Sequence, residues 1–185
     1  MKKFINYISI LALLSVLFLT ACKKEKGEHN EEELITSVIL KFTPVGGGTT
    51  LEYSFSDPDG PGGLAPTTST IVLSQNTTYN VAIEFKNDVT GEIINQEIEE
   101  EADAHRIYYT PAAGSSIQIS GLDTDADGVP LGLSSVWTCG ASGSSQVTVT
   151  LRHYGSTPPD KQIADPVNSP KSSTDAEVIF DTQVQ

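Results

Sequence analysis

The chain has 185 residues, of which 38% are hydrophobic, and its 24 acidic residues outnumber its 11 basic ones to give a formal net charge of −13 at pH 7. So acidic a protein is not expected to bind nucleic acid or to dock electrostatically on anionic lipid, because both present negative phosphates. The same charge is compatible with divalent cations and basic partners.

The N-terminal residues are typical of an export signal that ends at a lipid anchor. Two lysines precede an apolar run from Phe4 to Leu19, which is shorter than the ~20 apolar residues of a membrane span. The motif Leu19-Thr20-Ala21-Cys22 resembles the lipobox of bacterial lipoproteins. That resemblance implies cleavage after residue 21 and a diacylglyceryl group on Cys22, which would hold the protein on a membrane. The alternative is an ordinary signal peptide with an incidental cysteine.

Residues 22–33 are charged or polar after the cysteine, so we expect a disordered, acidic tether. This segment resembles the Glu-rich signals of surface-exposed lipoproteins of the Bacteroidota type, although a plain spacer is the alternative. Residues 34–185 suffice for a single domain. With Cys22 lipidated, Cys139 has no cysteine partner, and we expect it to be a small buried hydrophobic residue at a strand end.

From Leu34 onward, apolar and polar residues alternate with a period of two, which is typical of strands with one buried face. Clear alternation runs through residues 34–43, 51–56, 79–86, 147–152 and 178–184, with less regular candidates at 69–74, 106–110, 115–121 and 131–138. Nine short strands separated by Gly, Pro and Asp predict an all-β protein, an antiparallel, immunoglobulin-like β-sandwich. A barrel is the alternative closure.

The segment from Ile94 to His105 interrupts this pattern. It is rich in helix formers, and we expect a short helix capped by Asn95. Ile94, Ile98 and Ala102 would form its buried stripe. The long connections 57–68 and 155–175 are candidates for functional loops.

The segment from Asp123 to Val129 resembles the first half of a calcium loop. Asp123, Asp125 and Asp127 alternate, Gly128 follows, and the carbonyl of Val129 would be a further oxygen ligand for Ca²⁺. The twelfth position holds Ser134 instead of a bidentate glutamate, so an ordinary Asp-Gly turn is the competing interpretation.

A transition-metal site is a second hypothesis. Glu101 and His105 are four residues apart, so a helix would place them on one face. His153 is in phase with the apolar residues of its strand. Together Glu101, His105 and His153 would suit Zn²⁺ or Cu²⁺, provided that the helix and the strand 147–154 meet. A solvated acidic helix with an unrelated histidine at the edge of the core is the alternative.

Motifs for catalysis are missing from the sequence. It has no Gly-x-Ser-x-Gly elbow, Cys-x-x-Cys pair, phosphate-binding glycine loop or dinucleotide fingerprint. We therefore expect a protein that is not an enzyme.

Four segments resemble a group of small Bacteroidota-type lipoproteins that occur beside TonB-dependent receptors: Asn30–Thr36, Asp57–Gly60, Gly128–Leu133 and Val147–His153. Some members carry the label of a type 1 periplasmic binding fold, but that fold alternates strands and helices, and the strand-rich pattern here contradicts it. The resemblance implies a binding module, anchored through Cys22 at the outer membrane or cell surface and accessory to a nutrient or metal receptor. The alternative function is a structural or adhesive surface module with a loop stiffened by Ca²⁺.

Overall fold

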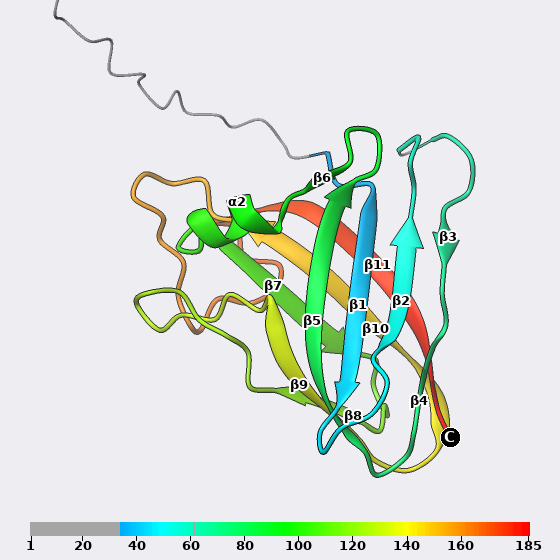
Figure 1. Cartoon of the computed structure of the whole chain (residues 1–185). Coiled ribbons are helices and arrows are strands. Elements are labelled where there is room, and N and C mark those ends of the chain that lie inside the picture. Colours follow the sequence, from blue (N-terminus) through cyan, green and yellow to red (C-terminus); the bar gives the residue numbers. More distant parts are fainter. Residues whose placement is uncertain (1–33, 61) are drawn as a thin grey trace, which may run out of the picture. The chain divides into compact units, whose positions relative to one another are not determined.

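The computed structural model describes residues 34–60 and 62–185, which form two β-sheets packed face to face (Figure 1). The predicted fold class is confirmed: the described chain is an antiparallel β-sandwich with a short helix. The predicted signal peptide, Cys22 and the tether 22–33 lie outside the described residues. Among the residues that are described, no helix is long and apolar enough to cross a membrane.

The larger sheet has seven strands in the order β3-β2-β1-β5-β9-β8, with β6 paired to β5. Their bounds are β1 Ser37–Pro44, β2 Leu51–Ser56, β3 Thr67–Thr68, β5 Thr78–Asn87, β6 Glu92–Ile93, β8 Ile117–Ser120 and β9 Ser134–Cys139. In Figure 1, β5, β1 and β2 form the layer in front.

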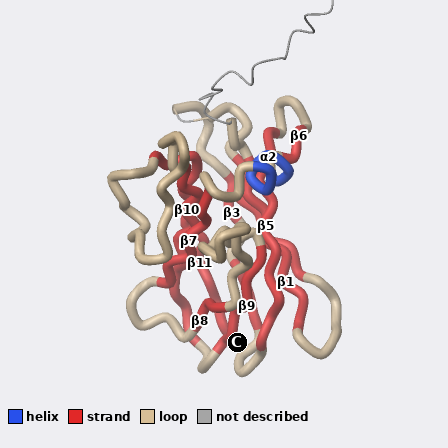
Figure 2. Tube along the Cα trace, turned by 90° about the vertical axis from the view of Figure 1, so that its left-hand side faces the viewer, coloured by secondary structure: helices blue, strands red, loops and turns tan. Residues whose placement is uncertain are grey.

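The smaller sheet has four strands in the order β4-β11-β10-β7. Their bounds are β4 Ile71–Leu73, β7 His105–Pro111, β10 Gly143–His153 and β11 Ser173–Val184. All pairs in it are antiparallel except β4 with β11. The edge-on view in Figure 2 separates this sheet, with β7, β10 and β11, from the layer that contains β1 and β5.

Alternating side chains of the two sheets fill the space between them, as the period of two predicts. Trp137 of β9 is completely buried and meets Phe42 of β1 edge-on at a centroid distance of 5.1 Å. It also meets Tyr109 of the opposite sheet at 5.7 Å. Cys139 is buried at the end of β9, which confirms the expectation of a small buried residue at a strand end, and burial raises the pKa of its thiol to about 11.

Helix α2, Asn95–Glu100, is shorter than the sequence suggested, and its predicted cap is wrong. The N-cap position is Ile94, with no side-chain hydrogen bond. The side chain of Asn95 instead accepts a hydrogen bond from the amide of Phe85 at 2.8 Å and donates one to the carbonyl of Ile83 at 2.7 Å. These bonds fasten the helix to β5, while Ile94 and Ile98 are buried as predicted.

Residue Glu101 ends the helix with a non-helical backbone, and a turn leads directly into β7 at His105. The segment 94–105 is therefore only half helical. This early ending matters because the helix, the turn and the start of β7 together carry two of the predicted metal ligands.

The long connection 154–172 is bound to the strands beside it. The guanidinium of Arg106 donates to the carbonyl of Gln162 at 2.9 Å, and that of Arg152 donates to the carbonyl of Ser169 at 3.1 Å. The hydroxyl of Tyr108 donates to the carbonyl of Asp165 at 3.0 Å. These three side chains hold the loop against the end of the sheet where β7 begins and β10 ends.

Candidate metal centre

The pairing of β7 with β10 brings His105 and His153 together. They are direct partners in the antiparallel register, at the first residue of one strand and the last residue of the other. Their rings stack with a centroid distance of 4.7 Å and an interplanar angle of 21°. The transition-metal hypothesis expected Glu101 and His105 on one face of a helix that meets the strand with His153. Neither residue lies in α2; His105 begins β7, and strand pairing brings it to His153.

Glu101 joins this pair from the turn after α2. The amide of His105 donates to the carbonyl of Glu101 at 3.2 Å, which folds the turn back on the strand. One ligand atom from each of Glu101, His105 and His153 lies within 4.8 Å of the other two. A tetrahedral zinc ion spaces its ligand atoms about 3.4 Å apart, so side-chain movements of at most ~1.5 Å would close the group around an ion.

The hydrogen bonds of His105 define its tautomer. Its Nδ1 lies 3.1 Å from the carbonyl oxygen of Glu101, and a carbonyl can only accept, so we assign the proton to Nδ1. The lone pair is then on Nε2. A second-sphere carbonyl that orients an imidazole in this way is a common feature of metal-binding histidines.

The protein keeps His105 neutral at physiological pH. Its side chain is 2% exposed, and burial is the main cause that lowers the pKa of its imidazole from 6.5 to about 4. The neighbouring His153 and Lys161 lower it further, while the carbonyl of Glu101 and the charge of Asp103 act in the opposite direction. A neutral imidazole is the form that binds a metal.

Two residues beside this group have no recognisable signature in the sequence. The first is Lys161, whose side chain is 2% exposed. Its ammonium donates to the carbonyls of Ala102 at 2.6 Å and His105 at 2.9 Å, and forms an ion pair with Asp125 at 2.8 Å. Lys161 thus positions the turn that carries both Glu101 and His105. The second residue is Asp175 of β11, whose Oδ2 lies 3.9 Å from Nε2 of His105.

The structure does not gather the predicted calcium ligands. Asp123 accepts hydrogen bonds from the amides of Gly132 at 2.8 Å and Ser134 at 3.0 Å. The carbonyl of Val129 accepts from the amide of Asp125, and Asp127 is exposed. Within residues 34–60 and 62–185, the acidic and histidine side chains whose ligand atoms all lie within 4.8 Å of one another in a group of three are Glu101, His105 and His153.

Asp125 takes the role of a loop anchor instead. One carboxylate oxygen accepts from the amides of Asp127 and Val129, and the other binds Lys161. Burial opposes ionisation, but the hydrogen bond from Lys161 and those backbone amides outweigh it, so the pKa of Asp125 is lowered. The carboxylates of Asp123 and Asp125 are therefore engaged by the protein's own donors, including the ammonium of Lys161, as in an ordinary Asp-Gly turn.

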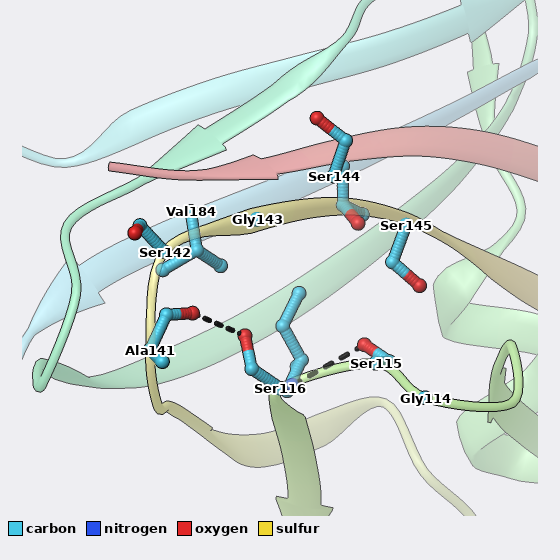
Figure 3. A pocket seen from close by; sticks show the side chains of 11 residues that line it. Gly114, Ser115, Ser116, Ala141, Ser142, Gly143, Ser144, Ser145 and Val184 are labelled. Atoms are coloured by element: carbon cyan, nitrogen blue, oxygen red, sulfur yellow. Dashed lines mark hydrogen bonds between the residues drawn. The ribbon is translucent and has the colours of Figure 1, made fainter.

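A small pocket lies where β10 begins and β11 ends (Figure 3). It has a volume of about 200 Å³, and its lining includes five serines. Ser115 and Ser116 precede β8, Ser142 precedes β10, and Ser144 and Ser145 lie in β10. The hydroxyl of Ser116 donates to the carbonyl of Ala141 at 2.6 Å. The lining contains no acidic, basic, histidine or aromatic side chain, so it offers far weaker ligand chemistry than the histidine group.

No protein-family model matches the chain, and no curated protein matches it. Among solved structures, the crystal structure of the S-layer protein SbsC domains 4 and 5 is similar at 15% sequence identity, with a TM-score of 0.30. That similarity covers 78% of this chain and 70% of the other.

Proposed function

We propose that this protein is a lipid-anchored, non-catalytic module that binds a divalent transition metal, Zn²⁺ or Cu²⁺, through Glu101, His105 and His153. The observation that carries the proposal is the stacked pair of histidines on adjacent strands with a carboxylate from the neighbouring turn. Two imidazoles and a carboxylate are ligands that favour zinc and copper over calcium or magnesium.

The rigidity of the surroundings supports this proposal. Both histidines lie on paired strands, and the turn with Glu101 is held by the buried ammonium of Lys161. Sites on strands are held more precisely than sites on loops, which favours metal affinity.

The anchor and the location are proposed from the sequence. The lipobox ending at Cys22 would place the module at the outer membrane or cell surface. There it would serve as an accessory to a TonB-dependent metal receptor.

Metal binding is tested with the full chain purified in detergent, by elemental analysis and by calorimetric titration with Zn²⁺ and Cu²⁺. Wild-type protein should bind one ion, and His153→Ala should weaken binding by at least about 100-fold. The matched controls are His29→Ala, which removes the remaining histidine of the sequence, and Glu97→Gln, one helical turn before Glu101. A wild-type protein that binds neither ion would refute the proposal.

Anchoring and the accessory role need separate tests. Wild-type protein should partition into the detergent phase, while Cys22→Ser should remain in the aqueous phase. Deleting the gene should impair growth when zinc or copper is scarce, and His153→Ala should reproduce that defect. Normal growth of the deletion strain under both limitations would contradict the accessory role.

A further inference from the structure

Asp175 reaches the histidine pair through an irregularity in the sheet. The register between β10 and β11 passes from Leu151 opposite Ala176 to Arg152 opposite Thr174, so Asp175 is the additional residue of a β-bulge. Bulges re-aim side chains and are frequent beside functional sites. Here the side chain of Asp175 is only 6% exposed, and its Oδ2 faces Nε2 of His105.

The distance between these two atoms fits an ion between them. At 3.9 Å they are too far apart for a hydrogen bond. With the proton of His105 on Nδ1, a lone pair on Nε2 faces a carboxylate oxygen. Two ligand atoms of a tetrahedral zinc ion are about 3.4 Å apart, so a movement of ~0.5 Å would bring both atoms within bonding distance of one cation.

We propose that Asp175 is a fourth ligand, which completes a site of two histidines and two carboxylates. This inference rests on the proposed metal-binding function and specifies the class of site. His105, His153 and Asp175 come from three adjacent strands, β7, β10 and β11, and Glu101 comes from the turn above them. Four protein ligands leave no open position for a catalytic water.

A closed site implies that the metal is held or carried, and is not used for chemistry. The ligands differ in accessibility, because Glu101 is exposed while His105 and Asp175 are buried. An ion would therefore enter and leave on the Glu101 side. This arrangement suits a module that takes up a metal and passes it on.

The test compares Asp175→Asn with Asp181→Asn, an exposed aspartate on the same strand. Zn²⁺ affinity is measured by competition with a chelating dye, and the ligand set is measured by the visible absorption of Co²⁺ in place of Zn²⁺. Asp175→Asn should weaken Zn²⁺ binding by at least about 100-fold and should change the Co²⁺ bands. Asp181→Asn should alter neither quantity. The circular dichroism of the metal-free variants shows that both are folded, and a misfolded Asp175→Asn protein is replaced by Asp175→Ser.

The outcomes separate the two proposals. If wild-type protein binds zinc but Asp175→Asn leaves the Co²⁺ spectrum unchanged, Asp175 is not a ligand, while the three-ligand site stands. A loss of only 10–100-fold with an unchanged spectrum would show that Asp175 merely orients His105, and this also overturns the assignment. If wild-type protein binds neither zinc nor cobalt, both proposals fail.

Discussion

The buried ammonium of Lys161 offers the sharpest test of how this end of the sandwich is held together. Replacing Lys161 with Met keeps most of the side-chain volume and removes the charge. The carboxylate of Asp125, whose side chain is 4% exposed, then loses its ion-pair partner, and the carbonyls of Ala102 and His105 lose a donor. Breaking a buried pair from one side costs about 3–5 kcal/mol, because the remaining charge stays buried and uncompensated.

For a domain of this size, a loss of that magnitude lowers the melting temperature by about 6–20 °C. We would measure it by urea and thermal unfolding, followed by circular dichroism. The matched control is Lys171→Met in the same loop, where the ammonium is more exposed and pairs with Asp165 at 3.2 Å. Such a surface pair contributes about 0–1 kcal/mol.

A second variant identifies the source of the loss. Adding Asp125→Asn to Lys161→Met removes the uncompensated charge, so the double variant should be more stable than Lys161→Met alone. The reasoning is refuted if Lys161→Met and Lys171→Met differ by less than about 1 kcal/mol.

Three further predictions concern the site and its supports. The free energy of unfolding of the metal-free protein should fall by about 2 kcal/mol between pH 7 and pH 5. The pKa of His105 is about 4 in the folded state and 6.5 in the unfolded chain, so only the unfolded chain takes up a proton in this range. Urea unfolding at both pH values checks this, and the same loss in His105→Gln would contradict it. Adding Ca²⁺ should leave the melting temperature unchanged, because Asp123 and Asp125 bind protein donors; a clear rise would restore the calcium hypothesis. Gly132→Ala should destabilise the domain by about 1–3 kcal/mol, because the residue has a φ of +95° and a Cβ would lie 2.8 Å from the carbonyl oxygen of Ile107. If the variant and the wild-type protein unfold at the same urea concentration, this loop can shift freely.

The sequence alone was sufficient to predict the strands of this fold and their arrangement in two packed sheets. Each of the nine predicted strands corresponds to a strand of the structure, and the two additional ones, β3 and β6, have two residues each. Alternation between apolar and polar residues is a local property, so it can be recognised without knowing which strands pair. The helix was harder, because Asn95 is bonded to β5 and does not cap the helix.

The candidate site could be predicted only in part from local sequence patterns. The spacing of Glu101 and His105 is visible in the sequence, and so is the phase of His153. Their meeting depends on the register of β7 against β10, which joins residues 48 positions apart. That register follows from packing both sheets on one core.

Lys161 and Asp175 have no local signature at all. Lys161 is one of two lysines in a proline-rich loop, and it becomes a buried ion-pair partner only because that loop folds over the turn after α2. Asp175 faces His105 only because a bulge shifts the register of β11. Side-chain alternation thus determined the two sheets and which faces are buried. Long-range strand pairing and loop packing decided which polar groups meet at the end of the sandwich, because these contacts join segments that are distant in the chain.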